Sequence, residues 1–197
     1  MVLRALRPFV SHPEVVQVVL VLPPDDARTP PEFLRSLGSG LTIVGGGAAR
    51  ADSVAAGLAA LGPACATVLV HDAARPFVER GVIDTVIAHA RAGEGAVAAL
   101  RVSDTVKEAA ADDPTRVART VPRDGLWRAQ TPQGFPRGVL ERAHDEAGGD
   151  RSAATDDAEL VERLGVPVRL VPDSPRNLKV TTPDDLALAE LLAREGA

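Results

Sequence analysis

The chain has 197 residues, of which 45% are hydrophobic and 25% charged, and its formal net charge is -5. This length suits one sizeable core, and the composition excludes a wholly disordered or fibrous protein. Acidic and basic residues are interspersed, so there is no broad basic face for nucleic acid and no polybasic patch for a membrane surface. No apolar run approaches the roughly 18 residues of a membrane span, and the single cysteine, Cys65, allows no internal disulfide. We therefore expect one cytoplasmic domain over residues 1–197, with Cys65 as a buried structural thiol rather than a nucleophile.

Apolar runs alternate with helical patterns through the first half of the chain, which is typical of βαβ units on a mostly parallel sheet. The first strand pattern stops at Pro23-Pro24, the second runs into Gly45-Gly46-Gly47, and Gly62 ends the helix that follows. In chain order we expect a strand over Val15–Leu22, a short helix over 30–37, a strand over Leu41–Val44, a helix over Ala48–Leu61, a strand over Thr67–His71, a helix over Arg80–Arg91 and a strand over Ala96–Val102.

Residues 103–122 interrupt this alternation. Two short β-like runs, Thr105–Glu108 and Arg116–Val121, flank the turn signal Asp112-Asp113-Pro114 and predict a hairpin arm that projects from the sheet. Because such an arm has little core of its own, we expect it to pack against a second copy of the chain in a homodimer. The alternative is a solvent-exposed flap.

The last third of the chain ends in a strongly marked helix. Thr182 is placed to cap it, Pro183 takes its first position, and Asp184 and Asp185 face its positive end. The elements expected before it are a strand over Trp127–Gln130, helices near 136–147 and 155–164, and extended pieces over Val166–Val171 and Asn177–Val180. The fold class is therefore α/β.

The apolar run Val68–Val70 breaks into His71, Asp72, two alanines and Arg75, which predicts a strand that delivers charge to the edge of the sheet. In open α/β sheets the ligand crevice lies outside the carboxyl ends of the strands, so Asp72 and Arg75 are candidate ligand contacts. Their proximity suits a phosphorylated or metal-bound ligand. The alternative is a strand-to-helix turn in which Asp72 caps the next helix.

Other candidate contacts lie in three more segments. The glycines at 45–47 leave backbone N–H groups open at the start of a helix, where Arg50 and Ser53 share one face, although a purely structural turn has the same pattern. Lys179 lies in an apolar run, where an anion would offset the cost of an unpaired ammonium, although an edge-strand lysine is also common. Arg123 follows Pro122 and is either a ligand contact or a loop charge. No residue is assigned as a metal ligand.

Six segments occur together and in a fixed order: GGGAARADSV (45–54), VLVHDAARP (68–76), RDGLW (123–127), QTPQ (130–133), TDD (155–157) and NLKVT (177–181). In content and order they resemble the 2-C-methyl-D-erythritol 4-phosphate cytidylyltransferase family, over residues 1 to about 195. The resemblance implies a Rossmann-like sheet with a β-arm that interlocks two subunits. It also implies a reaction that joins the CMP part of CTP to methylerythritol phosphate and releases pyrophosphate, with Mg²⁺ bound mainly through the CTP phosphates.

The resemblance also implies roles for individual residues. Gly47, Ala48 and Ser53 would surround the cytosine, while Thr105 and Arg123 would reach into the neighbouring subunit's site. Lys179 and Arg123 would be the catalytic side chains. The residues implied at the sugar phosphate are Asp72, Arg75, Thr105, Arg123, Thr131, Thr155 and Lys179.

The family's opening strand, its Gly-rich loop of the type Pro-Ala-Ala-Gly-x-Gly-x-Arg and its Pro-Lys-Gln segment do not occur in the 197 residues. We expect this unit of roughly 30 residues to be absent, which would remove the triphosphate loop and leave the neighbouring strands with unpaired edges. A misplaced gene start, a truncated paralogue and a deliberate truncation all stay open. Two functions follow: a cytidylyltransferase, with ribitol 5-phosphate as an alternative substrate, or a catalytically inactive dimerisation module.

Overall fold

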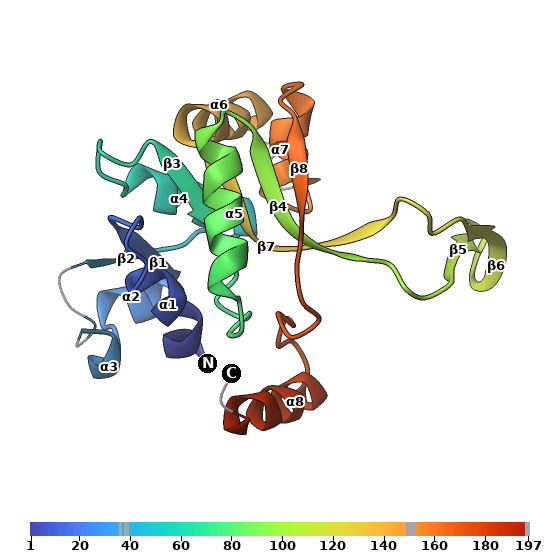
Figure 1. Cartoon of the computed structure of the whole chain (residues 1–197), viewed down its shortest axis with the longest axis horizontal. Coiled ribbons are helices and arrows are strands. Elements are labelled where there is room, and N and C mark those ends of the chain that lie inside the picture. Colours follow the sequence, from blue (N-terminus) through green and yellow to red (C-terminus); the bar gives the residue numbers. More distant parts are fainter. Residues whose placement is uncertain (36, 38–39, 149–152, 196–197) are drawn as a thin grey trace.

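The computed structural model describes residues 1–35, 37, 40–148 and 153–195. Its main sheet has the strand order β3-β7-β4-β8, and β1 pairs in parallel with β2 in a separate two-stranded sheet. Within the main sheet β4 and β8 are parallel, and β7 runs against both β3 and β4. The predicted α/β arrangement is confirmed, with β7 as the one reversed strand of that sheet (Figure 1). The strands of the two sheets are β1 (Val18–Leu22), β2 (Leu41–Gly45), β3 (Thr67–Val70), β4 (Gly95–Arg101), β7 (Trp127–Pro136) and β8 (Val168–Pro172).

The helices lie close to the predicted positions. The helix predicted over Arg80–Arg91 has these bounds, and the closing helix begins after the predicted cap, Thr182, whose hydroxyl accepts from the Asp185 N–H at 3.2 Å. Of the helix predicted over 30–37, residue 36 lies outside the described residues. The helices are α1 (Val2–Val10), α2 (Pro24–Arg28), α3 (Glu32–Arg35), α4 (Arg50–Ala59), α5 (Arg80–Arg91), α6 (Arg137–Ala147), α7 (Asp157–Arg163) and α8 (Pro183–Arg194). None in the described part of the chain has the length and apolarity needed to cross a membrane.

Two predicted extended segments differ from the structure. The strand predicted over Trp127–Gln130 continues to Pro136, because β7 is hydrogen-bonded on both sides and residues 130–135 are buried. The turn-type residue Gly134 is needed there, since an added Cβ would lie 2.4 Å from Cγ1 of Val86. The extended piece predicted over Asn177–Val180 is not part of a strand: this segment is irregular and connects β8 to α8.

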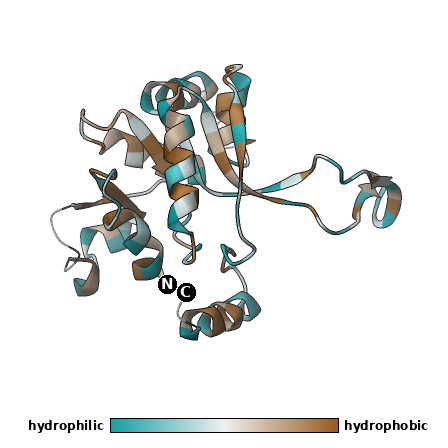
Figure 2. Ribbon diagram, viewed as in Figure 1, coloured by the Kyte–Doolittle hydropathy of each residue, from teal (hydrophilic) through white to brown (hydrophobic). Residues whose placement is uncertain are grey.

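The core has two layers, one on each face of the main sheet. On one face α5 packs with Val86 and Ile83 against Ala96 and Ala98 of β4. On the other face α4, α6 and α7 pack around Val97, whose side chain points the opposite way because strand residues alternate between faces. Figure 2 shows hydrophobic residues along the strands of the main sheet and a mixture of hydrophobic and hydrophilic residues on the helices. The sheet is therefore covered on both faces, and its loops lie at the edges of this core.

A cavity of about 370 Å³ lies between β1 and β3. The two strands belong to different sheets, and no described strand pairs with them across this space. Apolar side chains from both strands, including Leu20 and Val68, line most of it, and Arg50, Ser53 and Asp72 are also part of its lining. The cavity therefore shares Arg50 and Asp72 with the candidate site described below.

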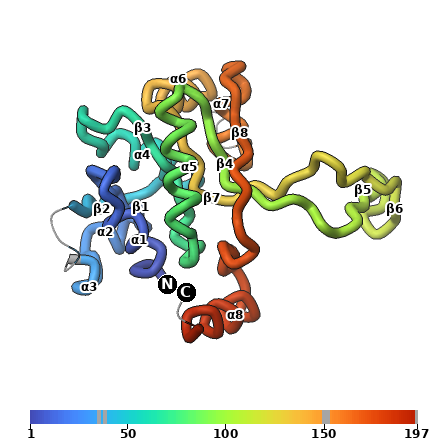
Figure 3. The backbone as a smooth tube through the Cα atoms, viewed as in Figure 1, coloured from blue at the N-terminus to red at the C-terminus, as the bar shows by residue number. Residues whose placement is uncertain are grey.

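The predicted arm is present as an antiparallel hairpin. Its strands are β5 (Val106–Ala110) and β6 (Asp113–Val121), and Val106 lies opposite Val121. The backbone in Figure 3 leaves the main sheet after β4, extends well away from the body and returns to β7. Most of β6 is exposed. The hairpin therefore presents its side chains to solvent in the single chain.

Candidate functional site

Asp72 lies just beyond the carboxyl end of β3, and three basic side chains surround its carboxylate. The ammonium of Lys179 lies 3.0 Å from Oδ2, and Nε of Arg75 lies 3.7 Å from the same oxygen. Nε of Arg50 lies 3.8 Å from Oδ1. Because the Asp72 side chain is only 18% exposed, one partly buried carboxylate lies beside three cations. The surplus of positive charge makes this edge of the sheet suitable for an anionic ligand.

The charge states of this cluster follow from its burial and its pairing. Burial alone would raise the pKa of Asp72, but the hydrogen bond and charge of Lys179, with the charges of Arg50 and Arg75, lower it below its usual value. Burial lowers the pKa of Arg75, and the charge of Asp72 opposes that fall. An arginine nevertheless stays protonated at neutral pH. Asp72 is therefore an ionised acceptor held among cations.

The loop after β3 is a turn rather than the start of a helix. The N–H of Arg75 donates to the carbonyl of Asp72 at 2.9 Å, and the next helix, α5, begins only at Arg80. The alternative in which Asp72 caps the following helix is therefore wrong. The turn brings the carboxylate of Asp72 and the guanidinium of Arg75 to the same side of the loop.

The irregular segment between β8 and α8 is fastened to this turn. Nη1 of Arg75 donates to the carbonyl of Asn177 at 2.8 Å, and the N–H of Val180 donates to the carbonyl of Ala74 at 2.9 Å. These two hydrogen bonds fix the backbone on both sides of Lys179. The ammonium of Lys179 reaches Asp72 while its side chain stays 46% exposed, so it also faces solvent where a ligand would approach.

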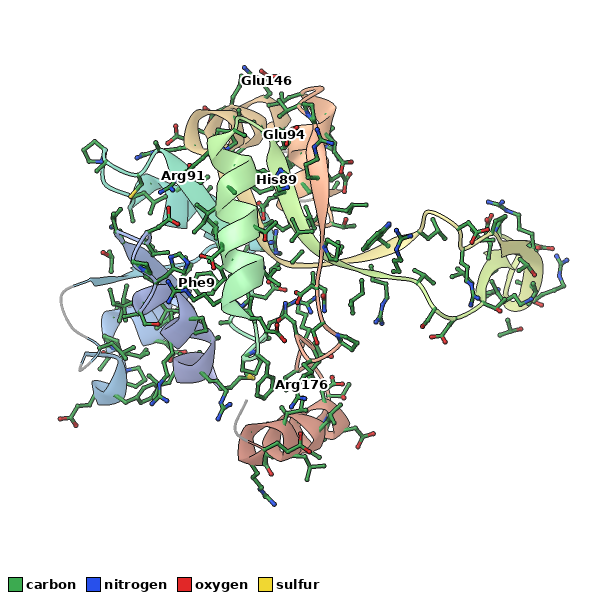
Figure 4. The ribbon with its side chains drawn as sticks, viewed as in Figure 1. Phe9, His89, Arg91, Glu94, Glu146 and Arg176 are labelled. Atoms are coloured by element: carbon green, nitrogen blue, oxygen red, sulfur yellow. The ribbon has the colours of Figure 1, made fainter. Side chains whose placement is uncertain are left out.

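His71 and Thr131 hold the backbone of Asp72 from the sheet side. Nε2 of His71 lies 3.0 Å from the carbonyl oxygen of Arg75, which can only accept, so Nε2 carries the hydrogen. Nδ1 then accepts from the hydroxyl of Thr131 at 3.0 Å, and this oxygen accepts from the N–H of Asp72 at 3.0 Å. The ring of Phe9, labelled in Figure 4, covers His71 with the ring centroids 4.8 Å apart. Thr131 is 4% exposed, so it joins β7 to the loop from a buried position.

This arrangement predicts a specific loss of stability in mild acid. Burial lowers the pKa of His71 from 6.5 to about 4, so the folded protein keeps the ring neutral while the unfolded chain takes up a proton below 6.5. The contribution of neutral His71 to the free energy of unfolding is complete above pH 6.5. It is lost as the pH falls toward 4, with a slope of at most about 1.4 kcal/mol per pH unit. Urea unfolding at pH 7 and pH 5 should show a smaller decrease in His71→Asn than in the wild type. Equal decreases in the two proteins would contradict this account.

The glycine loop between β2 and α4 has a geometry that other residues could not adopt without displacing its neighbours. A Cβ on Gly47 would lie 2.3 Å from Cβ of Asp52, and a Cβ on Gly46 would lie 2.6 Å from Oγ of Ser53. The N–H of Gly47 donates to Oγ of Ser53 at 3.2 Å. The N–H of Gly46 donates to the carbonyl of Leu22 at 2.8 Å, so the prediction of open N–H groups is wrong for Gly46 and Gly47. Gly47 and Ala48 are exposed, and Ser53 lies beside them on α4, so the three residues predicted at the nucleotide lie together.

The side chain of Arg50, at the start of α4, connects the glycine loop to the start of α7. Nη1 of Arg50 lies 2.8 Å from Oδ2 of Asp157, whose side chain is 1% exposed. Asp156 caps α7, since its Oδ1 accepts from the N–H of Glu159 at 3.0 Å. The N–H and hydroxyl of Thr155 donate to Oε2 of Glu159 at 2.9 Å and 3.2 Å. Thr155 therefore lies directly before the start of α7, which Arg50 contacts through Asp157.

The two predicted site residues of the arm lie apart from this cluster. Thr105 and Arg123 are exposed at the base of the hairpin, and Arg123 donates to the carbonyl of Ser103. Neither forms a hydrogen bond or ion pair with Asp72 within the described part of this chain. The structure therefore brings together Asp72, Arg75, Thr131 and Lys179, and connects them through Arg50 to the glycine loop and α7.

Sequence reasoning did not identify three residues of this arrangement: His71, Arg50 as a bridge between carboxylates, and Asp157 as its buried partner. Arg50 and Asp157 lie inside the segments GGGAARADSV and TDD, so the motifs mark their neighbourhood. Their pairing depends on how α4 and α7 meet in space, which a local pattern does not encode.

The carboxylates at this edge do not form a metal site. No group of three His, Cys, Asp or Glu side chains is placed to hold a metal ion within the described ranges. Asp72 is surrounded by cations, and the oxygens of Asp156 accept from Glu159 and from the side chain of Gln133 at 2.8 Å. A divalent cation held by these protein groups would compete with Lys179 and the arginines, so the donor set does not fit one.

The fold and site together define a Rossmann-like α/β protein that presents a cationic, loop-built site at the carboxyl end of its sheet. The sequence model of the family described as IspD, 2-C-methyl-D-erythritol 4-phosphate cytidylyltransferase, matches residues 1–195. The chain belongs to this family, and the predicted resemblance is confirmed.

Similar proteins agree with this assignment. The chain is 48% identical over 191 residues to a bifunctional enzyme IspD/IspF of Anaeromyxobacter dehalogenans, covering 96% of this chain and 49% of the relative. It is 46% identical to a 2-C-methyl-D-erythritol 4-phosphate cytidylyltransferase of Salinibacter ruber, covering 96% of this chain and 79% of the relative. The crystal structure of the enzyme of that name from Thermus thermophilus has a TM-score of 0.80 and 40% identity, covering 98% of this chain and 86% of that one. The chain thus spans about half the length of the bifunctional relatives that it matches.

Proposed function

We propose that this chain catalyses, or forms the catalytic part of a protein that catalyses, the transfer of CMP from CTP to 2-C-methyl-D-erythritol 4-phosphate. A phosphate oxygen of the sugar phosphate attacks the α-phosphorus of CTP, the bond from that phosphorus to the bridging oxygen breaks, and pyrophosphate leaves with the electron pair. The observation that carries this proposal is the group of Lys179, Arg75 and Arg50 around Asp72, in segments that match the family.

The residues present suit this chemistry. A phosphate monoester is already an ionised nucleophile at neutral pH, so the protein must align it and offset charge rather than remove a proton. Lys179 is the proposed catalytic cation, because its ammonium is partly exposed and its backbone is fixed on both sides. Asp72 is the proposed acceptor for a substrate hydroxyl, and Arg75, Thr131 and Thr155 complete the sugar-phosphate side.

The nucleotide side is proposed at the glycine loop. Gly47 and Ala48 are exposed, and Ser53 lies beside them at the start of α4 with its hydroxyl bonded to the Gly47 N–H, so a base could be held against this loop. Because the protein's own carboxylates do not fit a divalent cation, we propose that Mg²⁺ enters bound to the phosphates of CTP. When bound, it would supply charge neutralisation on the triphosphate.

The experiment is CTP-dependent release of pyrophosphate in the presence of Mg²⁺. It is run with methylerythritol phosphate and with ribitol 5-phosphate, on residues 1–197 and on the same chain extended upstream in its reading frame. Release with methylerythritol phosphate by either form supports the proposal, and a preference for ribitol 5-phosphate would replace the substrate. A folded protein that releases no pyrophosphate in either form would contradict the proposal and favour a non-catalytic module.

A homodimer built through the arm is part of the proposal. The hairpin is mostly exposed in the single chain, and Thr105 and Arg123 at its base are exposed and make no hydrogen bond or ion pair with Asp72 among the described residues, which leaves them available for a second subunit's site. Replacing residues 107–120 by a short Gly-Ser turn should convert a dimer to a monomer in sedimentation velocity, with little change in far-UV circular dichroism. A shortened protein that still sediments as a dimer would exclude the arm as the interface.

The proposal also includes the domain organisation of the chain and its cellular compartment. The family match over residues 1–195 supports a single nucleotidyltransferase-like domain over residues 1–197. Use of CTP with a sugar phosphate is consistent with a cytoplasmic enzyme, and the chain's one cysteine, Cys65, is free and buried.

A further inference from the structure

The buried carboxylate of Asp157 lies outside the predicted substrate contacts and is held from two sides. Its Oδ1 lies 3.0 Å from Nε2 of His144, and its Oδ2 lies 2.8 Å from Nη1 of Arg50. The contact with His144 is a hydrogen bond, whereas the contact of Oδ2 with Arg50 is an ion pair without hydrogen-bond geometry. The side chains of His144 and Asp157 are 4% and 1% exposed, so solvent cannot replace either contact if it is lost. A carboxylate in such a position requires its partners, and its position is set by the packing of α6 against α7.

The guanidinium of Arg50 extends from this rigid anchor toward the candidate site. While Nη1 contacts Asp157, Nε lies 3.8 Å from Oδ1 of Asp72. One planar group therefore connects the start of α4, the start of α7 and the loop after β3. A lysine has no such fork and could not face both carboxylates in the same way.

We propose that Arg50, anchored by the buried pair of Asp157 and His144, is a positioning residue that orients the carboxylate of Asp72 for the substrate. This inference rests on the proposed function for its kinetic consequences, although the contact itself exists without a ligand. It also assigns a task to the acidic pair 156–157: Asp156 caps α7, and Asp157 anchors the guanidinium. The contacts of Arg50 with Asp72 and Asp157 connect the predicted nucleotide loop to the predicted sugar-phosphate side.

The kinetic test compares Arg50→Lys and Asp157→Asn with the wild type. It uses whichever of the two forms, residues 1–197 or the chain extended upstream, releases pyrophosphate. Both variants should raise KM for the sugar phosphate about tenfold with a smaller change in kcat, since an orienting contact to a binding group is lost. The double variant should be little worse than the worse single one, because both changes break the same connection. A purely structural role would instead lower the melting temperature and the active fraction while KM stays unchanged.

A matched control is available on β8, the edge strand opposite β3 in the main sheet. Arg169 makes a two-nitrogen contact with Oε1 of Glu94, at 2.9 Å and 2.6 Å, beside His89 at the end of α5. Figure 4 labels Glu94 and His89 at this end of the molecule. Arg169→Lys breaks a similar pair and should leave KM for both substrates unchanged. If Arg50→Lys behaves like Arg169→Lys, the inference is overturned.

A second measurement needs neither catalysis nor ligand. Carboxyl NMR titration of Asp72 in the ligand-free protein reports how closely the guanidinium is held, alongside Lys179 and Arg75. The pKa of Asp72 should rise in Arg50→Lys, because the Arg50 charge contributes to lowering it, and stay unchanged in Arg169→Lys. An unchanged Asp72 titration in a folded Arg50→Lys protein would overturn the inference. An inactive wild type would contradict the proposed function, and the titration would still decide the role of Arg50.

Discussion

Replacing Lys179 by methionine is expected to lower kcat about 100- to 1,000-fold, the usual effect of removing one group that stabilises charge in a transition state. Methionine keeps most of the side chain's length and removes the ammonium that lies 3.0 Å from Asp72. The charge developing on the attacked phosphorus then loses its nearest proposed protein cation. Because Lys179 is 46% exposed and its ion pair is partly solvated, the melting temperature should change little.

The measurement is steady-state pyrophosphate release at saturating CTP and sugar phosphate, in the form of the protein that is active. Arg169→Met removes a surface cation remote from the site and serves as the control. A Lys179→Met protein that keeps at least half of the wild-type kcat would exclude Lys179 as the catalytic cation. A loss confined to KM would reassign it to substrate binding alone.

Replacing Phe135 by alanine is expected to destabilise the fold by about 3–5 kcal/mol. Phe135 is fully buried on β7, in the core layer that includes Leu140 of α6 and Val97 of β4. A Cβ on Gly95 would lie 3.2 Å from the ring of Phe135, and β7 lies between β3 and β4, so truncation leaves a cavity in the middle of the sheet rather than at its edge. Because β7 carries Thr131, the variant should also weaken the loop that holds Asp72.

Urea denaturation followed by circular dichroism gives this loss directly as a change in the free energy of unfolding. Leu188→Ala on α8 is the control, since Leu188 is 49% exposed and its truncation should change that free energy by less than about 0.5 kcal/mol. Similar losses in the two variants would mean that β7 is not the centre of the core.

The sequence determined most of the local structure. The helix over Arg80–Arg91 has its predicted bounds, and α8 begins at its predicted cap, because periodicity and capping residues are local signals. The hairpin at 103–122 follows from two β-like runs around a turn. The order of six short segments was sufficient to predict the family that the comparisons then confirmed.

The tertiary structure decided what these segments do together. The strand was predicted only over Trp127–Gln130, yet two neighbouring strands hold β7 extended to Pro136. Lys179 was predicted on a strand, but it lies in an irregular segment that two hydrogen bonds fasten to the loop of Asp72. The bridge from Arg50 to Asp157 joins the starts of two helices far apart in the chain. A local pattern encodes the period and ends of an element, whereas contacts between charges depend on which elements the packed core places side by side.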